Sequence, residues 1–322
     1  MSDAEEQILQ TIRQGRFLPS IPAVALEVLR LARDPRVSVE RLAETIERDP
    51  ALAAKLLRYA NSTYYAGNQP IVSLPQAIVR LGVRGTKLLA LSFNLTEAVG
   101  GDLRDFDFHT FWQRSLTTAV AARRLAHHSV RSLADEAFLV GLLADVGSPV
   151  LAGAFAQRYR TVSTTFLRSP QNLAEIELKI LGVAHPLVGR RLAESWHLPA
   201  DLCQALGAHH DPASLPRESP AFNLAAVVAI AAVVADIVVR GPAESRINQL
   251  VTLFHDQFAL RTAHLAAMLK GVDQEIQDIA DLLAVSLPVA YNVHAEAKAE
   301  MLRLAMAPAD ATEAAGPKTP KS

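Results

Sequence analysis

The sequence has a single cysteine, Cys203, so an internal disulfide framework is ruled out and a reducing compartment fits. It also lacks an excess of positive charge, because 32 Lys and Arg stand against 33 Asp and Glu. An extended phosphate-binding surface normally shows such an excess, so nucleic acid is not expected as a partner. Residues 1–6 are acidic and lack the apolar core of a secretory signal. These absences predict a cytoplasmic protein whose Cys203 is a buried helix residue rather than a catalytic thiol.

Long apolar runs are scarce as well. In the stretch of residues 224–239, the fully apolar part ends at Asp236, after about a dozen residues. This length is well short of the roughly 20 residues that span a bilayer, so a buried core helix is favoured over a membrane segment. Half of the chain is apolar, which is ample for a buried core.

Alternating strand patterns are hard to find, whereas helix signals recur along the whole chain. Ser38 and Asp49 are plausible N-caps, Pro50 suits a first helical position, and Gly82 can end a helix with a positive φ. The sequence therefore predicts an all-α protein. Helices are expected over residues 85–98, 110–126, 133–145, 173–181, 187–196, 200–209, 222–240 and within 243–306.

Five side chains could form a metal centre if the helices bring them together: Asp145, His185, His209, His210 and Asp236. Carboxylates and imidazoles projecting from different helices of a bundle suit Mn, Fe, Zn or Mg. Spacing along the sequence does not show such convergence, and a single histidine is more often a surface or hydrogen-bonded residue than a ligand.

Other polar residues have simpler interpretations. Arg123 and Arg124, near two histidines, are expected at a solvated helix end rather than in an anion-binding patch. Glu175 and Glu177 are expected to be exposed or to cap a helix, and Trp196 to anchor the core.

Several separate blocks of sequence, all in the right order, resemble the HD-related output domain (HDOD) family. They are LPSIP (18–22), IERDPAL (46–52), LLRYANS (56–62), SLPQAIVRLG (73–82), FWQRS (111–115), GLLADVG (141–147), HPLVG (185–189), WHLP (196–199) and the pair at 209–210. The resemblance covers roughly residues 15 to 214. Asp236 resembles the last acidic position of the related HD phosphohydrolases.

The resemblance implies a multi-helix architecture with two lobes. After an N-terminal segment, residues 1–16, it implies an N-terminal helical lobe over residues 17–98, packed on an HD-like helical lobe over residues 99–214. Residues 215–306 are expected to form a C-terminal helical extension. Residues 307–322 turn to Ala, Pro, Thr and Lys and are expected to be disordered.

HDOD proteins are similar in fold to HD and HD-GYP phosphodiesterases, whose histidines and aspartates bind metals that activate water. The resemblance implies that Arg114 stands where those enzymes have a histidine ligand, and that their His-Asp pair falls at Ala144 and Asp145. No Gly-Tyr-Pro follows His210 either.

Because a guanidinium keeps its charge and repels a divalent cation, Arg114 disfavours metal-dependent hydrolysis at this site. We expect Arg114 to occupy the vacated site and to pair with Asp145, with Asp236 as a further candidate partner. The alternative is an Arg114 side chain turned outward to solvent.

The favoured function is a non-enzymatic output or scaffold module of bacterial signal transduction, without a cofactor, that acts through protein–protein interaction with signalling proteins. The segment before residue 17 is too short for a receiver, cyclase or kinase domain, so its input is expected from a separate partner or a small ligand. One alternative is a residual metal-dependent phosphodiesterase, acting on a cyclic dinucleotide through Asp145, His185, His209, His210 and Asp236. Another is a sensor in which Arg114 binds a small phosphorylated ligand.

Overall fold

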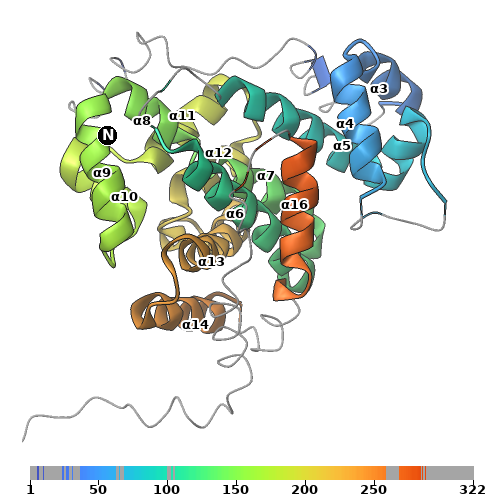
Figure 1. The fold of residues 1–322 in the computed structure, drawn as a ribbon. Helices are drawn as coiled ribbons and strands as arrows, with labels where there is room; N and C mark the ends of the chain where they lie inside the picture. The colour runs from blue at the N-terminus through green and yellow to red at the C-terminus, as the bar shows by residue number, and fades with distance from the viewer. Residues whose placement is uncertain are drawn as a thin grey trace, which may run out of the picture.

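The computed structural model describes residues 37–62, 69–99, 106–258 and 268–283, together with isolated positions outside these ranges. All the regular secondary structure in these residues is helical (Figure 1). Apolar side chains from nearly every helix join one hydrophobic core. The prediction of an all-α fold is confirmed.

The first group of helices contains residues expected for the N-terminal lobe. The Ser38 side chain accepts a backbone N–H of the first turn that follows it, and the Asp49 side chain accepts two, so both predicted N-caps are present. Gly82 has a φ of 73° and interrupts the helical geometry where a break was predicted. The helices of this group are α3 (Val39–Ile46), α4 (Pro50–Ala60) and α5 (Leu74–Val99).

The second group contains the candidate site residues. The helix predicted over residues 133–145 ends at Leu143, so Asp145 lies in a turn, and two further helices over residues 147–168 were not predicted. The members of this group are α6 (Phe108–Ser129), η1 (Arg131–Leu133), α7 (Ala134–Leu143), α8 (Gly147–Ala154), α9 (Ala156–Arg168), α10 (Leu173–Leu181), α11 (His185–Ser195), α12 (Ala200–Ala208) and η2 (Pro212–Ser214).

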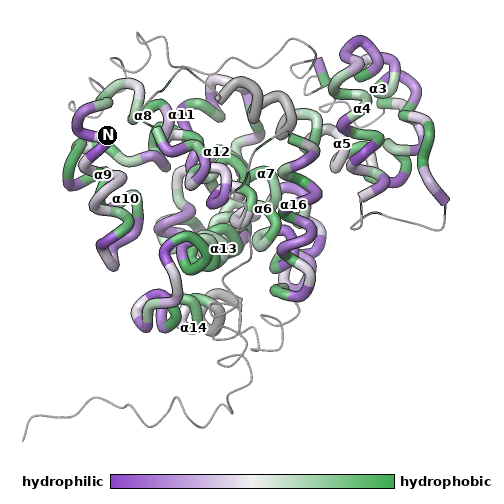
Figure 2. Tube along the Cα trace, viewed as in Figure 1, coloured by the Kyte–Doolittle hydropathy of each residue, from purple (hydrophilic) through white to green (hydrophobic). Residues whose placement is uncertain are grey.

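Helix α13 (Pro220–Arg240) is the central helix of the bundle and packs against α6, α7, α12 and α14. Figure 2 shows it as a hydrophobic segment in the middle of the molecule. Two helical stretches, Arg131–Ala154 and Pro220–Arg240, have the length and composition of a membrane span, but 89% of the apolar window of each is buried inside the fold. Both therefore have the burial of core helices, as was predicted for residues 224–239.

Besides α13, two more helices of the predicted C-terminal extension are described, α14 (Glu244–Phe258) and α16 (Val272–Leu282). Helix α16 packs against both α6 and α4, and in Figure 1 it lies between the first group of helices and the rest of the bundle. The expected disordered tail, residues 307–322, lies outside the described residues.

The crossing of α6 and α7 depends on Gly141. A Cβ atom at this position would lie 2.8 Å from Ala119 Cα and 2.9 Å from the carbonyl oxygen of Thr118, both of which are backbone atoms. We therefore expect Gly141→Ala to lower the free energy of unfolding by about 1 to 3 kcal/mol, because the helices must separate.

The matched control for this variant is Gly189→Ala in α11, where the nearest atom, Val146 Cγ1, would be at an ordinary 3.4 Å. Alanine favours a helix over glycine, so this control is expected to be neutral or to add up to about 1 kcal/mol. Chemical denaturation measures both. Equal midpoints for the two variants would contradict the close helix crossing.

Candidate functional site

The structure brings the predicted site residues together from five places in the chain. Arg114 lies on α6, Ala144 and Asp145 in the turn between α7 and α8, and Asp236 on α13. His185 begins α11, while His209 caps the C-terminus of α12 and His210 follows it.

Local geometry holds the Asp145 turn against α11. The carbonyl of Asp145 accepts the N–H of Ser148 at 2.9 Å and so leads directly into α8. Gly147 packs so closely on α11 that a Cβ would overlap the carbonyl oxygen of His185. The absence of a side chain at position 147 therefore allows Asp145 to approach His185.

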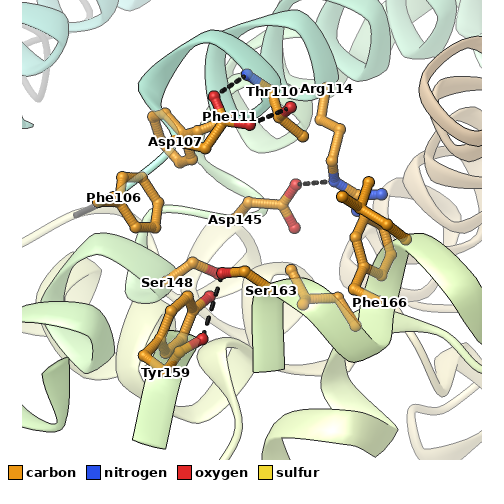
Figure 3. Close-up of a pocket in the computed structure, with 12 residues that line it drawn as sticks. Phe106, Asp107, Thr110, Phe111, Arg114, Asp145, Ser148, Tyr159, Ser163 and Phe166 are labelled. Carbon is orange, nitrogen blue, oxygen red and sulfur yellow. Dashed lines mark hydrogen bonds and ion pairs between the residues drawn. The ribbon is translucent and has the colours of Figure 1, made fainter. Parts of the chain in front are cut away.

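Arg114 is 3% exposed and points into this centre. Its Nε donates to Asp145 Oδ2 at 3.0 Å, as Figure 3 shows, and its Nη1 forms an ion pair with Asp236 Oδ1. The guanidinium carbon also lies 4.9 Å from the centre of the Phe166 ring. The expected pairing with Asp145 is confirmed, and the further candidate, Asp236, is also a partner. The alternative of a solvent-facing Arg114 is wrong.

A second guanidinium extends the network. Arg240, one turn after Asp236 on α13, forms an ion pair with that carboxylate. Its Nη1 also donates to the carbonyl oxygens of Phe166, Ser169 and Gln171 at 3.0 to 3.1 Å. These carbonyls lie at and just beyond the C-terminus of α9, where the backbone lacks helical partners. Arg240 thus connects the charged centre to the end of α9.

His185 is fully buried and has partners at both ring nitrogens. Its Nδ1 lies 2.6 Å from Glu177 Oε2, and its backbone N–H donates to the same oxygen at 2.7 Å. Its Nε2 lies 3.2 Å from Asp145 Oδ1. Burial lowers the pKa of His185, but the carboxylates of Glu177 and Asp145 outweigh burial and raise it.

The other two histidines are neutral at pH 7. Nδ1 of His209 lies 2.8 Å from the carbonyl oxygen of Leu206, which can only accept, so Nδ1 carries the proton. Burial, followed by repulsion from His185, lowers the pKa of His209 to about 4. Burial and the neighbouring imidazoles hold the pKa of His210 well below its usual value.

Asp145 is ionised in the same surroundings. Burial alone raises a carboxyl pKa, but the charges of Arg114 and His185 more than compensate and lower the pKa of Asp145 to about 2. The centre therefore contains a carboxylate–guanidinium pair beside three imidazoles.

Glu177 is the site residue that the sequence analysis missed. It is 0% exposed, and besides holding His185 it accepts the hydroxyls of Tyr159 at 2.8 Å and Ser148 at 3.2 Å. The expectation of an exposed or capping residue is wrong for Glu177, although Glu175 does bond to the Asn172 cap. The signal was its position one turn from both Leu173 and Leu181, on the apolar face of α10.

A family model for the HDOD domain matches residues 18–212, which is more than half of the chain. The chain belongs to the HDOD family. An uncharacterized protein of Treponema pallidum (strain Nichols) is 25% identical over 204 residues, which are 62% of this chain and 39% of that protein. The chain thus matches well under half the length of this curated relative.

Solved structures show the same fold. An HDOD domain protein of unknown function from Geobacter sulfurreducens has a TM-score of 0.62 and 24% identity, covering 92% of this chain and 98% of its own. A "Putative phosphohydrolase" of Shewanella amazonensis SB2B has a TM-score of 0.63 and 22% identity, and the match covers 92% of this chain and 97% of that chain. A "Putative signal transduction protein" of Marinobacter aquaeolei VT8 has a TM-score of 0.62 and 23% identity, and the match covers 87% of this chain and 65% of that chain.

The donor set of this HDOD centre only partly fits a divalent metal. The ligand nitrogens of His185, His209 and His210 lie within 4.8 Å of one another, which is close enough to share an ion. Both carboxylates that would complete the set, Asp145 and Asp236, are instead engaged by the Arg114 guanidinium. A divalent ion here would face a fixed positive charge, so the complete centre does not fit a metal.

A small pocket opens beside the charged centre (Figure 3). It has a volume of about 70 Å³, and Arg114 and Asp145 are among the residues that line it. Its walls come from the start of α6 and from α8, α9 and α10, and they include Phe106, Phe111, Tyr159 and Phe166. Because an apolar cavity of about 150 Å³ holds a benzene ring, this pocket accommodates only a few atoms in its enclosed part.

Glu177→Gln tests the assignment of the His185 contacts. The variant keeps an oxygen beside Nδ1 but removes the negative charge, so the pKa of His185 is expected to fall. An NMR titration of the imidazole ¹⁵N shifts measures this change.

Glu175→Gln is the matched control, because Glu175 is exposed near the start of the same helix. It should leave the titration of His185 as in the parent protein. A His185 that titrates at the same pH in Glu177→Gln and in the parent would show that Glu177 does not govern its charge.

Proposed function

We propose that this HDOD protein is a non-catalytic module of bacterial signal transduction that works in the cytoplasm through contacts with other proteins. The observation that carries the proposal is the ion pairing of Arg114 with both Asp145 and Asp236. Metal-dependent phosphoester hydrolysis needs a cation that lowers the pKa of water and stabilises charge on phosphate. A guanidinium fixed on two carboxylates does not activate water, because it has no coordination position to offer.

The electrostatic balance of the centre supports the same proposal. The positive charge of Arg114 is compensated by two buried carboxylates, so the site is satisfied without any ion. We accordingly propose that the protein uses no metal cofactor. The same balance disfavours the phosphate-sensor alternative, because a phosphate would have to displace Asp145 or Asp236 from the guanidinium.

The three clustered imidazoles favour a residual metal-dependent phosphodiesterase as the second candidate. His185, His209 and His210 are near enough to one another to hold an ion without help from the carboxylates. The name of the Shewanella amazonensis structure points to the same reaction class, and that of the Marinobacter aquaeolei structure to signalling. The two candidates differ in whether the protein binds a metal and turns over a phosphodiester.

Restoring the two missing ligands tests the proposal. The double variant Arg114→His, Ala144→His removes the blocking cation and supplies two imidazoles, so it should retain Mn²⁺ or Fe²⁺ after dialysis. The parent protein should retain none and should not hydrolyse a cyclic dinucleotide. Elemental analysis and a phosphodiesterase assay with added Mn²⁺, Fe²⁺ or Mg²⁺ measure these outcomes.

Arg168→His is the control, since Arg168 is exposed at the end of α9 and the variant adds only a surface histidine. The proposal would be contradicted if the parent protein held near-stoichiometric metal and hydrolysed the phosphodiester, and if Asp145→Ala lost that metal. The protein would then be an enzyme.

A further inference from the structure

A second cluster of charged side chains lies toward the C-terminal end of α6, at Arg123 and Arg124. Arg123 and Arg124 were expected at a solvated helix end. This expectation is wrong for Arg123, which is only 1% exposed. The guanidinium carbon of Arg123 lies 4.6 Å from the centre of the Phe138 ring on α7. A buried guanidinium needs a counter-charge.

The counter-charge comes from the C-terminal extension. Glu275 of α16 is 3% exposed, and each of its two carboxylate oxygens forms an ion pair with one of the two arginines. Its Oε1 forms an ion pair with Arg123 Nη2, and its Oε2 accepts from Arg124 Nε at 2.5 Å. One carboxylate is thus shared by two guanidinium groups.

Arg124 also holds the backbone that enters α16. It donates to the carbonyl oxygens of Met268 and Gly271 at 3.3 Å, and to that of Lys270. Gly271 has a φ of 72° and forms the sharp turn before the helix. Arg124 therefore fixes both the entry of α16 and its buried carboxylate.

The same cluster reaches the first group of helices. Arg123 Nη1 donates to the hydroxyl of Tyr59, in the last turn of α4. The Tyr59 ring packs on Tyr65 with a centroid distance of 5.3 Å, and the Tyr65 hydroxyl lies 3.4 Å from Asp135 Oδ1 at the start of α7. Helix α16 itself packs on both α4 and α6, with Val272, Ile276 and Ile279 buried.

We propose that α16 is a strap that holds the N-terminal helices α3 to α5 against the rest of the bundle, and that Glu275 is the residue that fastens it. The strap lies outside residues 18–212, the part of the chain that the HDOD model matches. Removing Glu275 would leave the buried Arg123 guanidinium and the partly exposed Arg124 guanidinium without their shared counter-charge, which favours release of the strap. Release frees the N-terminal helices to move and so alters the surface that they present to a partner.

This inference does not rest on the proposed function, because the cluster is separate from the Arg114 centre and exists whether or not that centre is catalytic. A strap can open locally while the rest of the bundle stays folded, whereas a permanent part of the core opens only when the whole protein unfolds. Loss of Glu275 should open α16 and α4 locally while α11, α12 and α13 keep their protection.

Pulsed electron paramagnetic resonance measures the position of the N-terminal helices in the full chain. Nitroxide labels are placed at Val79→Cys on α5 and Leu178→Cys on α10, because both positions are well exposed. The native Cys203 is buried, and burial raises the pKa of its thiol to about 11, so it does not compete for the label. The parent protein should give one narrow distance distribution.

Glu275→Gln should broaden that distribution and shift it to longer distances. It should also speed amide exchange in α16 and α4 by about ten-fold or more, without a change in α11 to α13. Asp281→Asn is the matched control, because it removes the same charge from an exposed position of the same helix, where the Asp281 carboxylate accepts a hydrogen bond from Gln277. This control should behave as the parent protein.

Arg124→Gln gives a second, milder release, because the buried pair between Arg123 and Glu275 remains. It should shift the distribution in the same direction, and it decides the question if Glu275→Gln does not fold. An unchanged distance distribution in the folded variants would overturn the proposal. So would a loss of exchange protection that is uniform over all helices, because α16 would then be an inseparable part of the core.

Discussion

The guanidinium of Arg114 carries a positive charge into the middle of the helical bundle, where it must be balanced. Asp145 balances it from the turn between α7 and α8, and Asp236 balances it from α13. Removing one partner from such a buried pair typically costs about 3 to 5 kcal/mol, because the remaining charge is left uncompensated. The positions of three segments, α6, the α7–α8 turn and α13, are therefore tied to one side chain.

Two chains of contacts leave this pair and reach most of the site. One runs from Asp236 through Arg240 to the end of α9. The other runs from Asp145 through His185 to Glu177, whose carboxylate is held by α8 and α9 hydroxyls. Every strongly buried charge in these chains has an opposite charge or a hydrogen-bond partner, as a structural network requires. Such a network specifies how the helices pack, and in it both carboxylates are paired with Arg114.

Local signals in the sequence were enough to predict the helical fold, since caps such as Ser38 and Asp49 act within one turn. The two helices over residues 147–168 were missed because their residues favour a helix only weakly: α8 contains two glycines and a proline, and α9 is rich in Thr, Val and Ser. The pairing of Arg114 was predicted from family resemblance rather than from spacing. Glu177 and Arg123 were misjudged because a charged side chain is expected to be exposed until its partner is known. The partner of Arg123 lies 152 residues away in the sequence, and that of Glu177, although only 8 residues away, lies on the next helix.

The central claim is that Arg114 takes the place of a metal ion among these histidines and carboxylates. A crystal of the protein grown with excess Mn²⁺ tests it most directly, through anomalous scattering from the metal. We predict no anomalous peak within bonding distance of His185, His209 and His210, and an Arg114 guanidinium that lies between Asp145 and Asp236. A strong peak bound to these imidazoles, with Arg114 displaced from the carboxylates, would contradict the account.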